Sequence, residues 1–142
     1  MLSITGAYAL RATMYLARRA GEGPVRVEDV AGALSVPRNY LSKILHALVK
    51  EGLLRSERGP RGGFELAVPA STVTLLQVVE PFEDLEEGRR CVLGRGECSD
   101  ADPCALHEQW KGVASDLAAF FRDTVISDVV AGESRVDAIL NR

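Results

Sequence analysis

Three cysteines and a histidine lie close together in the second half of this 142-residue chain, and all four are residue types that bind metals. Cys91, Cys98, Cys104 and His107 follow the pattern C-x6-C-x5-C-x2-H. Iron–sulfur clusters are held by cysteine thiolates, and histidine replaces cysteine at some [2Fe–2S] centres. Three thiolates on a loop and an imidazole at the start of a helix are therefore candidate ligands of an iron–sulfur cluster.

Three other interpretations use the same residues. A zinc ion bound by three cysteines and one histidine is one of them, although structural zinc sites usually take their ligands from close Cys-x-x-Cys pairs. Thiol-based redox sensing is another, with Cys91 and Cys98 pairing on oxidation. The cysteines could also be free thiols without a ligand role. Their odd number does not favour a disulfide framework.

A second group of polar residues lies in residues 37–67, which predict a helix followed by a β-hairpin. Apolar residues of this helix recur at helical spacing and predict a buried stripe: Leu41, Ile44, Leu45, Leu48 and Val49. Polar residues among them are candidates to face a DNA major groove: Arg38, Asn39, Tyr40, Ser42 and Lys43. Asn39 has the groups to pair with adenine, and Arg38 or Lys43 those to pair with guanine.

The hairpin is predicted from two short strand-like runs, 53–57 and 64–67, joined by a glycine-rich segment that permits a sharp reversal. It carries three arginines, Arg55, Arg58 and Arg61, which suit contacts with phosphates or a narrow minor groove. A basic hairpin beside a helix with polar outward positions is what a duplex-binding protein needs.

Two helices are expected upstream, at residues 3–20 and 28–34. The second is separated from the helix after Pro37 by a tight turn, and a short helix, a turn and a second helix form a helix-turn-helix. With the hairpin added, residues 1–68 predict a winged helix-turn-helix domain. A generic helical domain would explain neither the arginines of the hairpin nor the polar positions of the helix.

The remainder of the chain predicts a short helix at 72–80, an acidic loop at 83–102 and a helix of about 39 Å at 105–130. The long helix has a wide apolar stripe that suits a partner helix in a homodimer: Leu106, Trp110, Val113, Leu117, Phe120 and Phe121. Alternatively, this helix lies on its own domain. We therefore expect a mainly α fold with a small β-hairpin wing, a connecting region at 69–104, a dimerisation helix at 105–130 and a tail at 131–142.

Charge is distributed unevenly along the chain. The net charge is −3, but residues 1–67 carry +4 and residues 68–142 carry −7. This asymmetry is expected when one half of a chain contacts phosphates and the other does not, and chance is the alternative, because +4 over 67 residues is modest. No apolar run approaches the roughly 20 residues of a membrane span, and no signal-peptide pattern is present, so a cytoplasmic protein without a membrane partner is expected. No cofactor fingerprint or nucleophile–base pair indicates an enzyme. A small thiol or iron–sulfur redox enzyme and a protein-interaction adaptor are the rival hypotheses.

The sequence resembles the IscR/NsrR family of winged-helix iron–sulfur transcriptional regulators, from the first helix to about Val130. The most specific match is the wing, Arg58-Gly-Pro-Arg-Gly-Gly-Phe64. The next are the loop before the long helix that carries Cys91, Cys98 and Cys104, called the cysteine loop below, and Tyr40-Leu41. The resemblance implies a homodimeric regulator with crossed long helices, a cluster near them, and palindromic promoter DNA as its partner. Redox state, iron or nitric oxide would be the signal.

The fourth ligand differs between branches of that family. In IscR-like members it is a histidine three residues after the last cysteine, the position of His107, whereas in NsrR-like [4Fe–4S] sensors it is an acid of the partner's first helix. Here no acid precedes Glu22 and Tyr8 stands at that place, so the resemblance favours a [2Fe–2S] cluster, with [4Fe–4S] as the alternative.

One feature departs from the family pattern. The gap between Cys91 and Cys98 is one residue longer than in IscR-like members, and Glu97, Asp100 or Asp102 could substitute as a ligand. Some family members also lack a cluster, so a family regulator that acts by thiol oxidation or through a protein partner is the alternative function.

Overall fold

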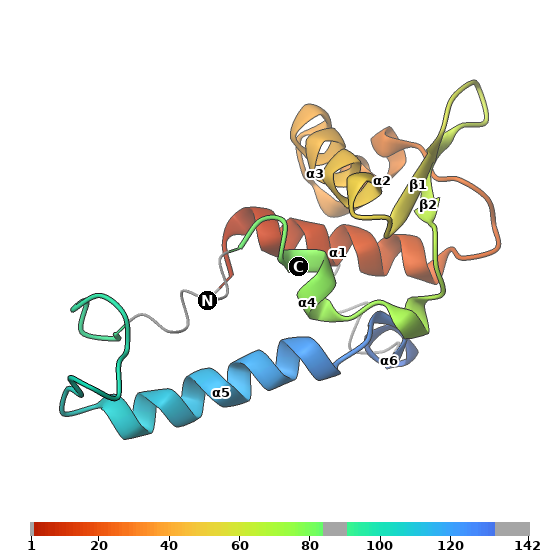
Figure 1. Cartoon of the computed structure of the whole chain (residues 1–142). Helices are drawn as coiled ribbons and strands as arrows, with labels where there is room; N and C mark the ends of the chain where they lie inside the picture. The colour runs from red at the N-terminus through yellow and green to blue at the C-terminus, as the bar shows by residue number, and fades with distance from the viewer. Residues whose placement is uncertain (1, 84–90, 133–142) are drawn as a thin grey trace.

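The computed structural model describes residues 2–83 and 91–132 and shows a mainly helical chain with one antiparallel hairpin, as the sequence predicts (Figure 1). The elements are α1 (Ile4–Arg18), α2 (Val27–Leu34), α3 (Arg38–Lys50), β1 (Leu54–Glu57), β2 (Gly63–Leu66), the 3-10 helix η1 (Ala70–Thr72), α4 (Leu75–Val79), α5 (His107–Asp123) and α6 (Ile126–Ala131). None of the helices in the described ranges is both long and apolar enough to cross a bilayer.

Helix α1 is the centre of the packing, because it contacts α2, α3, α4, α6 and β2. Its side chains at Ala9 and Ala12 are fully buried, and such small residues let neighbouring backbones approach closely. Ser3 caps the helix by accepting a hydrogen bond from the Gly6 amide at 3.1 Å. The helix-turn-helix and the C-terminal segments therefore lie on opposite sides of one helix (Figure 1).

The predicted helix-turn-helix is present. Helix α2 ends at Ser35, a left-handed residue with φ 55°, and the Val36 amide donates to the Ala31 carbonyl across the turn at 3.0 Å. Pro37 precedes the first residue of α3. The apolar stripe of α3 is confirmed, because Leu41, Ile44, Leu45 and Leu48 are all buried and Val49 is half-buried.

The wing is fixed to the rest of the domain at its base. Strands β1 and β2 pair with Arg55 opposite Glu65, and Phe64 of β2 exchanges two backbone hydrogen bonds with Val25, of 2.9 and 2.8 Å. Gly63 has φ 153°, and a Cβ atom there would come 2.3 Å from the Val25 carbonyl oxygen. Glycine is therefore required at this position for the hairpin to lie against the connection between α1 and α2.

The prediction of a single helix over residues 105–130 is wrong. The observed helix begins two residues later, at His107, and the segment is divided at Thr124 and Val125, which have extended backbones. The backbone at this point pairs with another segment instead: the Leu75 amide donates to the Thr124 carbonyl at 3.0 Å, and the Ile126 amide donates to the Val73 carbonyl at 2.8 Å. These bonds replace helical ones, so α5 and α6 are separate helices.

The region around the predicted 72–80 helix is also shorter than expected. It consists of η1 and the five-residue α4, which Thr74 and Gln77 begin with a reciprocal capping box. The predicted acidic loop at 83–102 is described only at residue 83 and from residue 91 onward. Of the predicted tail at 131–142, residues 133–142 lie outside the described residues.

The core extends from α1 to α6. Ile126 of α6 is fully buried, as are Val73 beside η1 and Val78 and Val79 of α4, and all four belong to the same apolar cluster as the residues of α1 and α3. The segments that follow the wing are therefore part of the hydrophobic core that supports the helix-turn-helix.

We expect Ile126→Ala to lower the free energy of unfolding by about 2–5 kcal/mol, because it leaves a cavity in this shared core. Ile4→Ala is the matched control, since Ile4 is 68% exposed, and it should change stability by less than about 0.5 kcal/mol. Urea denaturation followed by circular dichroism measures both. Equal stability of the two variants would contradict a core that includes α6.

Candidate DNA-binding surface and metal centre

The outer side of α3 carries the polar residues predicted to meet DNA. Asn39 and Lys43 are exposed and Ser42 is half-buried. Arg38 is also exposed, but its Nε donates to Oε1 of Glu28 at 2.8 Å, and its Nη1 donates to Oδ1 of Asn39 at 3.3 Å. The Arg38 guanidinium holds the pKa of Glu28 below its usual value, mainly through this hydrogen bond. Glu28 of α2 thus orients Arg38, a role for which its sequence position gives no signal.

Tyr40 connects α3 to α1. Its hydroxyl contacts the hydroxyl of Thr5, and its ring lies edge-on to the ring of Tyr8, with centroids 5.9 Å apart. The same end of α1 is bound to the segment before the cysteine loop, because the Ser3 amide donates to Oε1 of Glu83 at 2.7 Å. The N-terminal turn of α1 is therefore in contact with α3 on one side and with Glu83 on the other.

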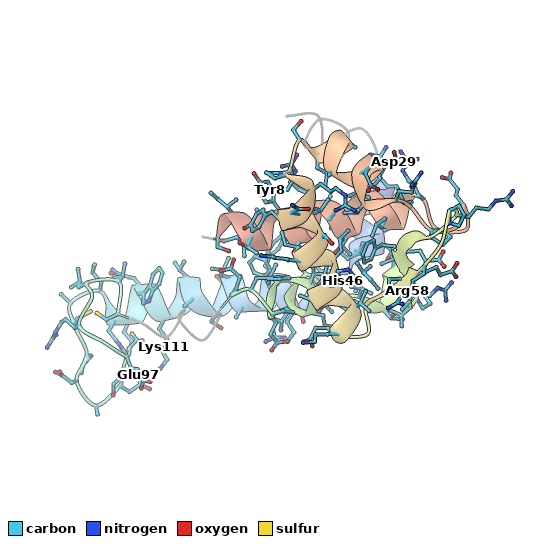
Figure 2. The ribbon with its side chains drawn as sticks, turned by 90° about the horizontal axis from the view of Figure 1, so that it is seen from above. Tyr8, Asp29, His46, Arg58, Glu97 and Lys111 are labelled. Atoms are coloured by element: carbon cyan, nitrogen blue, oxygen red, sulfur yellow. The ribbon has the colours of Figure 1, made fainter. Side chains whose placement is uncertain are left out.

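The wing presents its arginines in two ways. Arg55 is held by an ion pair of 2.7 Å with Glu65 on the opposite strand. Arg58 and Arg61 are exposed near the turn between the strands, and no ion pair of theirs is seen within residues 2–83 and 91–132. Figure 2 shows Arg58 at the opposite end of the molecule from Glu97 and Lys111.

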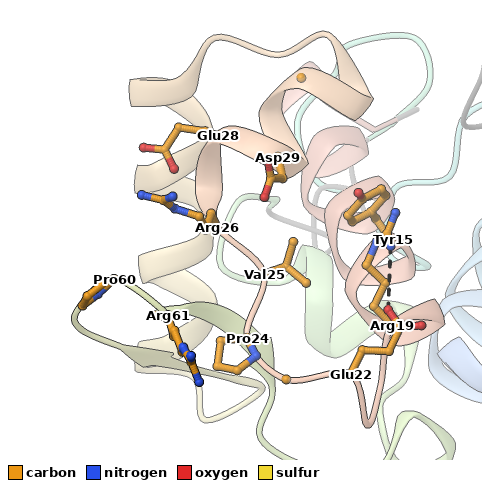
Figure 3. Close-up of a pocket in the computed structure, with 13 residues that line it drawn as sticks. Tyr15, Arg19, Glu22, Pro24, Val25, Arg26, Glu28, Asp29, Pro60 and Arg61 are labelled. Atoms are coloured by element: carbon orange, nitrogen blue, oxygen red, sulfur yellow. Dashed lines mark ion pairs between the residues drawn. The ribbon is translucent and has the colours of Figure 1, made fainter.

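An open hollow of about 900 Å³ separates the wing turn from α2 (Figure 3). Arg61 of the wing and Arg26, which precedes α2, both line it, as do Glu28 and Asp29. Arg26 is exposed and adds a cation to this side of the domain. Sequence reasoning missed it, because it belongs neither to the helical stripe nor to the wing.

The predicted metal ligands come together at the start of α5, where they form two pairs. Sγ of Cys91 lies 3.7 Å from Sγ of Cys104, and Sγ of Cys98 lies 3.2 Å from Nδ1 of His107. Cys91 and His107 are buried, with exposures of 8% and 4%, whereas Cys98 and Cys104 are half-buried. The structure thus brings Cys91 next to Cys104, not next to Cys98.

The backbone of the loop positions these sulfur atoms. The Cys91 amide donates to the Gly96 carbonyl at 2.7 Å and the Gly94 amide to the Cys91 carbonyl at 2.8 Å, which closes a tight turn. Backbone hydrogen bonds around Leu93 and Arg95 lower the pKa of the Cys91 thiol. Burial, followed by the neighbouring thiols, raises the pKa of Cys98. Cys91 therefore supplies a thiolate more readily than Cys98 does.

Carboxylates surround the histidine without joining the thiols. Within the described residues, three ligand atoms lie within 4.8 Å of one another at Asp100, His107 and Glu108, and the three thiols form no such group. Asp102 pairs with Arg95 at 3.3 Å, and Glu97 is exposed. Asp100 contacts His107, so it is the one of the three predicted substitute ligands that lies at the site.

Helix α5 has an exposed apolar face, which matches most of the predicted dimerisation residues. Leu106, Val113, Leu117 and Phe120 are 41–57% exposed, and Trp110 is half-buried. Phe121 does not belong to this face: it is 7% exposed, because it is packed in the core of its own chain. Figure 1 shows α5 extending away from the other helices toward the cysteine loop.

Comparison with known proteins identifies the family. Residues 2–132 match the Rrf2 family, described as iron-dependent transcriptional regulators. An HTH-type transcriptional regulator of Aquifex aeolicus is 37% identical over 95% of this chain and 94% of its own length. The HTH-type transcriptional regulator IscR of Escherichia coli is 29% identical over 96% of this chain and 83% of its own length.

Solved structures share the fold. T. potens IscR superposes with a TM-score of 0.74 at 23% identity, covering 93% of this chain and 87% of that one. CymR, the global cysteine regulator of B. subtilis, gives a TM-score of 0.75 at 24% identity, covering 92% and 96%. The resemblance drawn from the wing and the cysteine loop is confirmed, and the relatives are regulators, not enzymes. The chain belongs to the Rrf2 family of DNA-binding transcriptional regulators.

Proposed function

We propose that this protein is a homodimeric regulator whose binding to palindromic promoter DNA is controlled by an iron–sulfur cluster held by Cys91, Cys98, Cys104 and His107. The observation that carries the proposal is the gathering of these four side chains at the start of α5 as two close pairs. When bound, the cluster supplies a redox-active link between the cysteine loop and α5, and this link is sensitive to oxidants and to iron supply.

The pairing supports a dinuclear cluster over a single zinc ion. Two ligands at about 2.3 Å from one tetrahedral metal lie about 3.8 Å apart. Cys91 and Cys104 have this spacing, and Cys98 and His107 are similarly close, but the three thiols do not form one group. A [2Fe–2S] cluster takes two protein ligands on each iron, so it fits two pairs better than a mononuclear ion does. A [4Fe–4S] cluster is the second candidate.

The DNA-binding surface consists of α3 and the wing. In the proposed complex α3 enters the major groove, where Asn39 pairs with adenine and Arg38 or Lys43 with guanine, with Ser42 beside them. The wing is held on phosphates or in the minor groove by Arg55, Arg58 and Arg61. Arg26 adds a further cation on the same side of the domain. Tyr40 supports α3 from the side of α1, since its hydroxyl contacts the hydroxyl of Thr5.

Arg58→Ala should weaken binding to a duplex that the wild-type protein selects from a random pool. A dimer that neutralises about six phosphates has a log–log salt slope of about −5, and loss of Arg58 from both protomers should reduce its magnitude by about 2. Arg122→Ala on α5 removes an exposed cation outside the surface and serves as the control. Fluorescence anisotropy across a salt series measures both, and a slope near zero for the wild type would rule out this surface.

A second copy of the chain is the proposed occupant of the exposed face of α5. The face is apolar along a helix that leaves the core, and two-fold symmetry would place two copies of α3 on the two halves of a palindrome. The exposed positions Val113, Leu117 and Phe120 recur at spacings of four and three, as in packed helix pairs.

Leu117→Asp should therefore shift the protein from dimer to monomer in sedimentation velocity at micromolar concentration, because it buries a charge at the centre of that interface. Ser115→Asp adds the same charge about 200° away around α5, on the other side of the helix, and should leave the dimer intact. If both variants sediment alike, the dimer uses another surface.

Two contacts could transmit the state of the loop to α3. Glu83 precedes the cysteine loop and binds the first turn of α1, and that turn contacts Tyr40 of α3. A cluster bound at Cys91, Cys98, Cys104 and His107 would thus bias the position of Glu83 and, through α1, that of α3.

A thiol switch is the second candidate function, and the distance between Cys91 and Cys104 favours it specifically. Peroxide could oxidise these two thiols to a disulfide while being reduced to two molecules of water. One of the fold neighbours is Staphylococcus aureus CymR in its oxidized form, at a TM-score of 0.72 and 23% identity. This pairing differs from the one expected from the sequence, which joined Cys91 to Cys98.

Serine variants separate the two candidates. If a cluster is the sensor, Cys98→Ser and Cys104→Ser should both abolish the visible absorption and the iron and sulfide content of anaerobically purified protein, and both should remove control of DNA binding. If a disulfide is the sensor, Cys98→Ser should respond to peroxide like the wild type, and only Cys104→Ser should fail. A colourless wild-type protein that carries zinc would overturn the cluster proposal.

A further inference from the structure

Both ring nitrogens of His107 have polar neighbours, although the side chain is only 4% exposed. Nδ1 lies 3.2 Å from Sγ of Cys98, and Nε2 lies 2.7 Å from Oδ1 of Asp100. The nearby Glu108 is 4.0 Å from Nε2, which is too far for a hydrogen bond. The two nitrogens therefore face different chemistry, a thiol on one side and a carboxylate on the other.

The hydrogen bonds around Asp100 determine which nitrogen carries the proton. Nζ of Lys111 donates to the same Oδ1 at 2.8 Å, and an ammonium group can only donate. An ionised carboxylate can only accept, so Nε2 of His107 must be the donor in its bond to Asp100. In the neutral imidazole this leaves the lone pair on Nδ1, directed at Cys98.

Two local elements hold Asp100 in this position. His107 and Lys111 are four residues apart on α5 and therefore lie on the same face of the helix. Asp100 sits in a turn in which the Ala101 amide donates to Oγ of Ser99 at 3.1 Å and the Asp102 amide to the Ser99 carbonyl at 3.3 Å. The turn and the helix together place one carboxylate between an imidazole and an ammonium group.

We propose that Asp100 is a positioning residue that fixes His107 as the Nε2-protonated tautomer and so makes Nδ1 the atom that joins the thiolates as a ligand. Metal-binding histidines commonly donate their second N–H to a carboxylate, which orients the ring and strengthens it as a ligand. This inference rests on the proposed cluster function, but the tautomer is a property of the polypeptide and can be measured without a metal.

The first test uses full-length metal-free protein labelled with ¹⁵N-histidine. The wild type should show His107 as a single tautomer with a slowly exchanging proton on Nε2. Asp100→Ala should lose that protected proton, whereas Asp102→Ala, a matched change in the same turn at a residue that pairs with Arg95, should retain it. A wild-type proton on Nδ1 would overturn the inference whether or not the protein binds a cluster.

The second test uses protein reconstituted anaerobically with ferrous iron and sulfide. Asp100→Asn should release iron to a ferrous chelator about 10- to 100-fold faster than the wild type, as expected for loss of an outer partner of a ligand, and Asp102→Asn should match the wild type. Pulsed EPR of the reduced wild-type cluster should show coupling to ¹⁵N placed at Nδ1 of histidine.

The two tests distinguish failure of the inference from failure of the proposed function. If the wild type takes up no iron and sulfide, the cluster proposal fails and the nuclear magnetic resonance result alone decides the role of Asp100. The wild type could instead take up a cluster that couples to Nε2 of histidine, or Asp100→Asn could release iron at the wild-type rate. In either case the cluster proposal stands and the proposed role of Asp100 is wrong.

Discussion

The backbone pairing between residues 73–75 and 124–126 is the constraint on which the rest of the architecture depends. It ends α5 at Asp123, because the Thr124 carbonyl and the Ile126 amide bond to Leu75 and Val73 instead of continuing the helix. It also brings Ile126 into the core that α1 shares with α3. As a result the C-terminal end of α5 lies at the core. Its N-terminal end, next to the cysteine loop, lies away from the core (Figure 1).

This arrangement separates the cysteine loop from α3 and the wing within one chain. Figure 2 shows Glu97 and Lys111, which mark the loop and α5, far from His46 and Arg58, which mark α3 and the wing. In the proposed mechanism, two physical routes can join these ends: the apolar face of α5 in a dimer, and the contacts of Glu83 and Tyr40 with the first turn of α1. Both routes pass through packed elements that support α3, so a change in the loop can alter how two recognition helices are spaced.

Acidic partners restrain several of the side chains on which the proposed functions depend. Glu28 orients Arg38, Glu65 orients Arg55, and Asp100 binds both Lys111 and His107. Exposed pairs of this kind contribute little to stability. Their value lies in geometry, because they limit the directions in which long side chains point before DNA or a metal group is bound.

Local patterns in the sequence were sufficient for the elements whose causes are local. The stripe of α3, the turn before it and the glycine-rich wing follow from residue spacing and backbone freedom, so residues 37–67 were predicted closely. The set of cysteines and the histidine was also evident from sequence, since their crowding is visible without a structure. The break at Thr124 was missed, because its hydrogen-bond partners lie about fifty residues earlier in the chain.

Which of these residues meet depends on how the whole chain packs. The tertiary structure turns Phe121 into the core while Phe120 stays exposed, pairs Cys91 with Cys104, and brings Asp100 to His107. Residue types and short-range spacing were enough to predict the fold class, the candidate DNA-reading element and the list of candidate ligands. The pairing of ligands and the limits of α5 depend on contacts between distant segments, and such contacts are set when the chain packs.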